Sequence, residues 1–146
     1  MSEDKEKMTW KDGTAVWISR KVTRIKPDEK LKIEKISAED PKLIPPNFTD
    51  PMGGPMRLIQ GEGIGIDLNK RREPMPFWHR NNDYDEFIFC FKGSALWETE
   101  LGDVELRPGE MIFIPRGVAH KDTPRPGEQY IAIEIKSSSK LNKAIK

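Results

Sequence analysis

The sequence predicts an all-β domain, either a sandwich or a barrel, and three observations lead to this class. Apolar residues alternate with polar ones over short segments, which is the period of a half-buried β-strand. Glycine and proline signals for turns lie between these segments. No segment is a convincing amphipathic helix, and a short one is expected only in the C-terminal tail. A chain of 146 residues is long enough for one domain with a buried core.

The predicted strands follow one another along the chain. In the first, Leu31 and Ile33 alternate with Lys32 and Glu34, and the pattern continues less regularly to Ile36. The later segments with the same period are residues 56–60, 64–69, 87–92, 95–99, 104–107 and 131–135. The turn signals that separate them are residues 61–63, 92–93, 102–103 and 107–109.

The two ends of the chain are predicted to lie outside the barrel domain. Residues 1–12 are expected to form a charged flexible tail, which leaves residues 13–135 for the domain. Residues 136–146 contain three serines and four lysines. We interpret them as a solvated basic tail, with a nucleic-acid-binding arm as the alternative.

A proline-rich stretch interrupts the strand pattern. Residues 41–55 hold five of the twelve prolines. Because proline cannot donate a ladder hydrogen bond, this stretch is not a central strand. It is either a stiff surface connection or a flap over the mouth of a barrel.

The composition excludes several classes of protein. The 25 Lys and Arg nearly cancel the 24 Asp and Glu, and the net charge of +1 gives no reason to expect nucleic acid or a membrane as partner. Cys90 is the only cysteine, so a disulfide scaffold is excluded. No apolar run reaches the roughly 18 residues of a membrane span. The charged N-terminus has no apolar core of a secretion signal, and we expect a cytoplasmic protein that acts on a small molecule.

The only two histidines lie in segments that resemble the two consensus motifs of the cupin superfamily. The first segment, residues 77–93, contains His79, Arg80, Asn81, Glu86 and Gly93 in the order of the first motif. The second segment, residues 108–120, contains Gly109, Pro115, Arg116, Gly117 and His120, which match every position of the second motif. The two segments cover about a third of the chain and are about 30 residues apart.

The resemblance implies a cupin jelly-roll barrel, also called a double-stranded β-helix, with a divalent metal inside it. It implies that His79, Glu86 and His120 hold this metal. Two imidazoles and one carboxylate with open coordination positions are the ligand set of non-heme Fe(II) oxygenases. Fe(II) is therefore the preferred ion, while Mn, Zn, Ni and Cu stay open because ligand type alone does not distinguish them.

One position departs from the cupin pattern, because Asn81 replaces the usual second histidine of the first motif. The segment that begins at His79 resembles homogentisate dioxygenase, a family that opens an aromatic ring with Fe(II) and O2. In that family the ligand glutamate is one residue closer to the histidine, where this chain has Asp85. Glu86 is preferred because it fits the general cupin spacing and directly precedes Phe87.

Strand alternation predicts how the segment around Glu86 is oriented. It sends two sets of side chains to opposite faces, Glu86, Ile88 and Cys90 on one and Phe87, Phe89 and Phe91 on the other. If Glu86 points into the barrel, the three phenylalanines point outward and need a cover. We expect that cover to be the second subunit of a homodimer, with a layer of N-terminal strands as the alternative.

Several other residues are candidates for the site. Tyr84 and Asp83 lie between two of the predicted metal ligands and are the candidates for proton transfer. Asn81 is a candidate to ligate the metal weakly or to orient a water or substrate. The residues Arg71 and Arg72 are expected to form a solvated turn.

Three further residues are candidates for the substrate pocket. Arg57 could bind a substrate carboxylate, although a surface salt bridge would also explain it. Trp97 could stack on a flat ligand or serve as packing. Cys90 could line the pocket or be a small buried hydrophobe.

These observations favour a metal-dependent enzyme, and the leading hypothesis is an Fe(II) ring-opening dioxygenase acting on a small aromatic or hydroxyaryl acid. The alternatives are a non-catalytic cupin that binds a small ligand, and a metal-dependent sugar isomerase or epimerase. Aromatic residues and Arg in the pocket would favour an aromatic acid. Lys, Asp and Asn would favour a sugar.

Overall fold

The computed structural model describes residues 4–146, and the chain forms two compact units. The first unit ends at Lys35 and contains a two-stranded antiparallel hairpin of β1 (Lys5–Thr9) and β2 (Ala15–Ser19). Gly13 has a φ of 92° at the turn, a conformation that favours glycine. No strand is assigned between residues 20 and 35.

Two predictions for this unit differ from the structure. Residues 1–12 were expected to form a charged flexible tail, but Lys5–Thr9 form strand β1. Residues 1–3 lie outside the described residues. The strand expected near Leu31 and Ile33 is not formed, and both side chains are exposed. The Asp28 carboxylate accepts the backbone N–H of Lys30 and Leu31, which holds this stretch in a turn.

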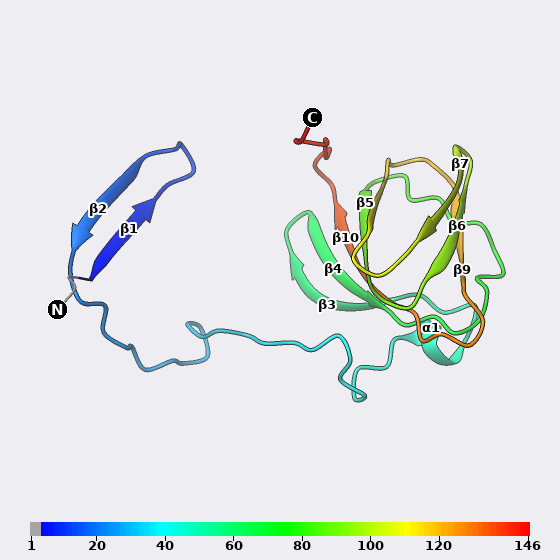
Figure 1. Cartoon of the computed structure of the whole chain (residues 1–146), viewed down its shortest axis with the longest axis horizontal. Helices are drawn as coiled ribbons and strands as arrows, with labels where there is room; N and C mark the ends of the chain where they lie inside the picture. Colours follow the sequence, from blue (N-terminus) through cyan, green and yellow to red (C-terminus); the bar gives the residue numbers. More distant parts are fainter. Residues whose placement is uncertain (1–3) are drawn as a thin grey trace. The chain divides into compact units, whose positions relative to one another are not determined.

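The second unit, Ile36–Lys146, is a β-barrel built from two antiparallel sheets (Figure 1). Five strands form the larger sheet in the order β3–β4–β10–β5–β8, and three form the smaller one in the order β7–β6–β9. The larger sheet comprises β3 (Met56–Gly61), β4 (Ile64–Asn69), β5 (Asp85–Lys92), β8 (Met111–Ile114) and β10 (Ile131–Ser137). The smaller sheet comprises β6 (Ala95–Thr99), β7 (Gly102–Leu106) and β9 (His120–Pro124).

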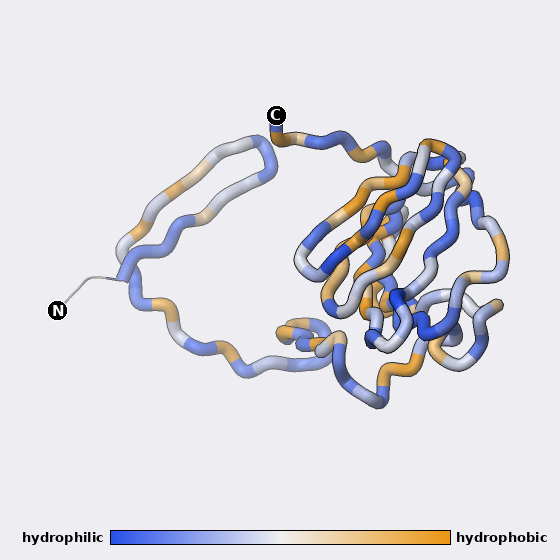
Figure 2. The backbone as a smooth tube through the Cα atoms, turned by 45° about the vertical axis from the view of Figure 1, so that its right-hand side comes forward, coloured by the Kyte–Doolittle hydropathy of each residue, from blue (hydrophilic) through white to orange (hydrophobic). Residues whose placement is uncertain are grey.

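The predicted all-β jelly-roll class is confirmed, and the six strands expected between residues 56 and 135 are all formed. Hydrophobic and hydrophilic residues alternate along these strands (Figure 2). The core cluster between the sheets consists of Ile88, Cys90, Ala95, Trp97, Leu106, Ile114, Tyr130 and Ala132. Within it the Trp97 indole donates a hydrogen bond of 3.1 Å to the Tyr130 hydroxyl, so neither polar atom is left unpaired.

The predicted orientation of β5 is confirmed. Glu86, Ile88 and Cys90 are buried, whereas Phe87 and Phe89 are only partly buried and Phe91 is exposed. Gly93 follows this strand with a φ of 67°, and a Cβ at this position would clash with the Gln129 carbonyl. Only glycine fits here, which gives a physical reason for the glycine of the first motif.

The proline-rich stretch contains α1 (Pro46–Thr49), which is the only helix within residues 4–146. A proline in the first turn is compatible with a helix because its missing N–H would have no partner there. The expectation of a short helix in the C-terminal tail is wrong, since residues 138–146 contain none. Asn47 is buried and its amide donates to Asn69, which ties this stretch to the barrel.

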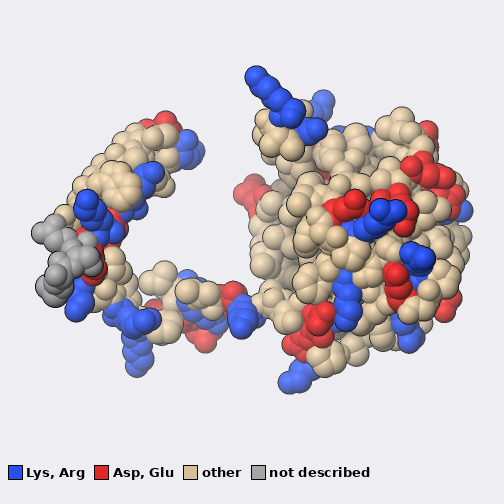
Figure 3. Space-filling view, in the orientation of Figure 1, with Lys and Arg blue, Asp and Glu red and all other residues tan. Residues whose placement is uncertain are grey.

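The C-terminal boundary also differs from the prediction. Lys136 and Ser137, which were placed in the basic tail, are the last residues of β10 and pair with Glu86 and Asp85 of β5. Positive and negative side chains are interspersed on the face of the barrel that Figure 3 shows. Within residues 4–146 no helix has the length and hydropathy needed to cross a membrane.

Candidate metal centre

The structure brings the three predicted ligands together at one end of the barrel. Glu86 lies on β5 and His120 is the first residue of β9. His79 forms an antiparallel β-bridge with His120, in which each backbone N–H donates to the other residue's carbonyl at 2.9 Å. One ligand atom from each side chain lies within 4.8 Å of the others. The two imidazole rings meet edge to face with centroids 5.3 Å apart.

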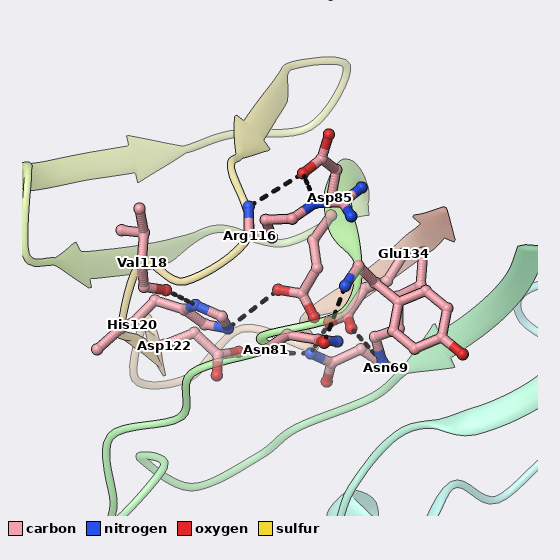
Figure 4. Close-up of polar contacts among 12 residues, drawn as sticks. Asn69, Asn81, Asp85, Arg116, Val118, His120, Asp122 and Glu134 are labelled. Carbon is pink, nitrogen blue, oxygen red and sulfur yellow. Dashed lines mark hydrogen bonds and ion pairs between the residues drawn. The ribbon is translucent and has the colours of Figure 1, made fainter. Parts of the chain in front are cut away.

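Hydrogen bonds fix the orientation of His120 (Figure 4). Its Nδ1 lies 3.1 Å from the Val118 carbonyl oxygen, so Nδ1–H donates to that oxygen. Nε2 then faces the Glu86 carboxylate at 3.1 Å. A hydrogen bond of this kind on the outer ring nitrogen is the usual way in which proteins orient a histidine ligand.

The charges of the three groups are coupled. Burial lowers the pKa of His120, but the hydrogen bond and charge of Glu86 outweigh it and leave this pKa raised. Burial likewise raises the pKa of Glu86, but the hydrogen bond from His120 and the charges of His120, Lys136 and His79 together outweigh it and lower this pKa. Burial lowers the pKa of His79, which favours the neutral imidazole that a metal requires.

The three side chains open into a cavity of about 310 Å³. Its wall is completed by the proline-rich stretch, which contributes Met52, Gly53, Gly54 and Pro55, and by Met75, Phe77 and Trp97. The flap interpretation of the proline-rich stretch is thus favoured over a plain surface connection. The polar side chains of the wall are Asn47, Asn69, Arg71, Asp122, Glu134 and Lys136.

A buried polar network surrounds the cavity. The Asn69 amide donates to Glu134 at 2.9 Å and to Asp122 at 3.4 Å. Asp122 lies 3.4 Å from the Nε of Arg71, and this atom makes no hydrogen bond although it is fully buried. The two terminal nitrogens of the Arg71 guanidinium donate to the Pro51 and Gly53 carbonyls, which ties the proline-rich stretch to the barrel.

The buried groups carry an excess of negative charge. Lys136 pairs with Asp67 at 2.7 Å and lies 3.7 Å from Glu134. The network as a whole holds four carboxylates, Asp67, Glu86, Asp122 and Glu134, against two cations, Arg71 and Lys136. Arg57 pairs with Asp67 from the edge of the network, so one of the four carboxylates is left without a cation. Such a charge in a region of low dielectric is costly unless it binds a proton or a cation.

Glu134 is expected to make the metal-free protein less stable as the pH rises. Burial raises the pKa of Glu134 from 4.5 to about 7, and the charge of Glu86 adds to this effect against the opposing Lys136 and Asn69. Between these two pH values the folded state therefore binds more protons than the unfolded state. The free energy of unfolding then falls with rising pH over this window, by up to about 3 kcal/mol.

Urea unfolding of the metal-free protein at pH 5 and pH 8 measures this effect. Glu134→Gln, which keeps the shape of the side chain but cannot ionise, should be more stable than the wild type at pH 8 and should lose less stability between the two pH values. Glu62→Gln, at an exposed turn, should behave as the wild type does. An unchanged pH dependence in Glu134→Gln would show that this carboxyl is not the source.

The structure separates the candidates for catalysis and substrate binding. Trp97 lines the cavity, with its ring centroid 5.8 Å from that of His120. Asp83 and Tyr84 are exposed and do not line the cavity, in contrast to their predicted role in proton transfer. The Asn81 side-chain oxygen accepts the backbone N–H of both residues, so it shapes the loop and does not line the cavity either.

Two of the other pocket predictions are also placed elsewhere. Arg57 forms an ion pair with Asp67 and lies outside the cavity lining, which agrees with the salt-bridge alternative. Cys90 is fully buried in the core, and burial raises the pKa of its thiol to about 11. Cys90 is therefore a small core residue and not part of the pocket wall. Asp85 is held by Arg116 at 3.0 Å and by the Leu141 N–H, so it is turned away from the ligand cluster.

Sequence reasoning missed most of the polar cavity wall. Arg71 was expected in a solvated turn and is 3% exposed. Asp67, Asn69 and Glu134 alternate with isoleucine and leucine along their strands, and nothing in the alternation showed that the polar side faces inward. The signal available in the sequence was that polar residues recur at alternate positions within residues 64–69 and 131–135. Only the structure showed that these segments, β4 and β10, pair and place Asp67 opposite Glu134.

Comparison with known proteins agrees with the architecture, although no family model matches the chain. A cupin-2 domain containing protein from Shewanella frigidimarina is 25% identical, with a TM-score of 0.50 over 57% of this chain and 79% of that one. A Bacillus halodurans protein superimposes with a TM-score of 0.54 over 60% of this chain and 72% of its own, at 15% identity, which shows the fold alone. The barrel has the cupin jelly-roll fold.

One curated protein also resembles the cupin domain in sequence. It is named "Putative dioxygenase", comes from Saccharolobus solfataricus, and is 28% identical over 80 residues. These residues are 54% of this chain, and the chain spans about a fifth (21%) of that protein's length. The similarity therefore concerns the domain and not the whole of the larger protein.

Proposed function

We propose that this cupin domain is a metal-dependent enzyme in which His79, Glu86 and His120 hold a divalent metal. We further propose that the metal is Fe(II) and that the reaction opens the ring of a small aromatic substrate with O2. The observation that carries the proposal is the convergence of two imidazoles and one carboxylate, within 4.8 Å of one another, on a cavity wall.

The surrounding residues fit a divalent cation. The four buried carboxylates outnumber the cations that pair with them, which are Arg57, Arg71 and Lys136, so a bound cation would be stabilised there. The Val118 carbonyl accepts from His120 on the side away from the cluster, so the Nε2 lone pair is directed at the site. Within residues 4–146 three protein ligands converge there, and such a site leaves coordination positions open.

The remaining residues suggest how a substrate would be handled. Fe(II), when bound, supplies a redox centre that can couple an electron-rich aromatic to O2. Trp97 and Phe77 offer apolar surface to a flat ring beside the ligand cluster. Glu134 lies in the same wall with a pKa raised by burial to about 7, so its carboxyl can hold or release a proton near neutral pH. The Saccharolobus solfataricus relative supports oxygen chemistry for the shared 80 residues.

Elemental analysis of protein purified without a histidine tag tests the ligand assignment. The wild type should contain close to one equivalent of divalent metal, with iron expected, after anaerobic reconstitution. Glu86→Gln should lose most of it, whereas the matched control Glu134→Gln, a buried carboxylate outside the ligand cluster, should keep it. No metal in the wild type would contradict the proposal and leave a ligand-binding module. Equal metal content in both variants would contradict Glu86 as ligand.

The polar wall favours a second candidate, a metal-dependent isomerase or epimerase of a polyhydroxylated substrate. Asn47, Asn69, Asp122 and Lys136 offer the donors and acceptors that hydroxyl groups need. The two candidates differ in their use of O2. Oxygen uptake with catechols and hydroxyaryl acids would support the dioxygenase. Conversion of sugars by the metal-loaded protein, without oxygen uptake, would support the isomerase.

A further inference from the structure

The net charge of the whole chain hides an uneven distribution between its two units. Residues 1–35 carry ten Lys and Arg against seven Asp and Glu, a net charge of +3, whereas residues 36–146 carry 15 against 17. Residues 13–27 contain four basic residues and no acidic one. In Figure 3, Lys and Arg side chains, in blue, lie along the hairpin and the chain that follows it. A basic element of this kind is the electrostatic footprint of an anionic partner.

One face of the β1–β2 hairpin, called the Trp17 face here, places positive charge beside an aromatic ring. Strand alternation gives this face six side chains, all of them exposed and none of them acidic. They are Lys5, Lys7 and Thr9 of β1 and Ala15, Trp17 and Ser19 of β2. Lys7 lies opposite Trp17, and its ammonium is 5.4 Å from the centroid of the indole ring.

Two acidic side chains of the hairpin are engaged away from this face. Glu6 lies on the other face of β1 and forms an ion pair with Arg20 at 3.3 Å. The Asp12 carboxylate accepts the backbone N–H of Thr14 within the turn. The ammonium groups of the Trp17 face are therefore free to bind an anion.

The chemistry of the Trp17 face distinguishes among anionic partners. A protein interface or insertion into a membrane surface needs several large apolar side chains. This face has one, Trp17, which is 63% exposed. An aromatic ring beside ammonium groups is the arrangement that binds single-stranded nucleic acid, because a base stacks on the ring while the cations contact phosphates. Lys5 and Lys7 are about 7 Å apart along β1, so both can contact one nucleic-acid backbone.

We propose that the Trp17 face binds single-stranded nucleic acid, with a base stacked on Trp17 and phosphates bound by Lys5 and Lys7. The exposed cations that follow β2 extend the phosphate contacts beyond the hairpin, and they are Lys21, Arg24 and Lys26. A duplex keeps its bases inside the stack, so it can use the cations but not Trp17. This binding is independent of the metal centre and of the reaction proposed for it.

Fluorescence anisotropy of a labelled single strand, titrated with the full-length protein, tests the proposal. With about four phosphate contacts, the logarithm of the association constant should fall against the logarithm of the salt concentration with a slope of about −3. Trp17→Ala should weaken binding by about 5-fold or more, because it removes the stacking surface. Trp17→Phe keeps an aromatic ring and should retain most of the affinity. Lys7→Gln should weaken binding and make the salt slope shallower by about 0.7.

Two variants are matched controls and should bind the strand as the wild type does. Trp78→Ala removes an exposed tryptophan of the barrel, over which the Lys121 ammonium lies 5.0 Å from the ring centroid. Lys32→Gln removes a lysine of the first unit that is already paired with Glu29 at 3.4 Å and with Glu34 at 3.5 Å.

Several outcomes would overturn the proposal. One is the absence of binding at about 50 mM salt with about 100 μM protein. Another is unchanged affinity in both Trp17→Ala and Lys7→Gln. Equal affinity for a duplex of the same length, or full competition by poly-glutamate, would also overturn it, because charge alone would then explain the binding. Binding to phosphatidylglycerol vesicles without binding to the single strand would identify an anionic membrane as the partner instead.

Discussion

Addition of Mn(II) to the metal-free protein is expected to raise the free energy of unfolding by about 4 kcal/mol at 1,000 times the dissociation constant. The gain arises because the folded state presents a site that the unfolded chain lacks. His79→Ala and His120→Ala should each lose nearly all of this gain, since each removes one of the three ligands. Urea unfolding with and without Mn(II) measures the gain within each variant, so any cost of the substitution itself cancels.

Tyr84→Phe is the control for this experiment. Tyr84 is exposed and lies outside the cavity lining, so the full gain should remain. Retention of the full gain in both histidine variants would contradict the ligand assignment. A gain in the wild type that both histidine variants lose, together with full retention in Tyr84→Phe, would agree with it.

Arg71→Met is expected to lower the free energy of unfolding by about 3–5 kcal/mol. Arg71 and its partner Asp122 are both nearly fully buried, and removal of the guanidinium leaves the carboxyl without its cation. The same change removes both hydrogen bonds to the Pro51 and Gly53 carbonyls. We therefore also expect faster proteolysis within the loop that closes the cavity.

Arg72→Met is a matched control because it makes the same change at the next residue. Arg72 is exposed, donates to the Phe48 carbonyl at 3.0 Å and lies over the Phe48 ring, and its loss should cost about 1 kcal/mol or less. Urea unfolding of the two variants measures the difference. If Arg71→Met and Arg72→Met lowered the free energy of unfolding equally, the distinction between a buried Arg71 and a solvated Arg72 would be contradicted.

The ligand cluster shows how far local sequence signals reach. His79, Glu86 and His120 occupy motif positions, and strand alternation sends Glu86 inward, so all three could be named before their geometry was known. The choice between Glu86 and Asp85 depended on spacing. The structure shows Asp85 hydrogen-bonded to Arg116 on the other side of the strand.

The proton-transfer candidates show where such signals fail. Tyr84 and Asp83 were chosen for their closeness in sequence to the ligands, but their loop directs them to the surface. Glu134 lies 48 residues beyond Glu86 and reaches the cavity because β10 pairs with β5. Closeness in a barrel follows strand pairing, and pairing between distant strands is not visible in a local pattern.

The sequence by itself determined the all-β class, six of the eight strands of the barrel, the two cupin motifs and the three ligand candidates; β8 and β9 were not predicted. Each depends on local period, turn chemistry or motif spacing. Only the tertiary structure decided that β4 and β10 turn their polar sides into the cavity and their isoleucines outward. Alternation shows that the two faces of a strand differ, but the closure of the barrel decides which face is inside. The same closure buried Arg71 and Lys136 against carboxylates from other strands, and so determined the charge of the site.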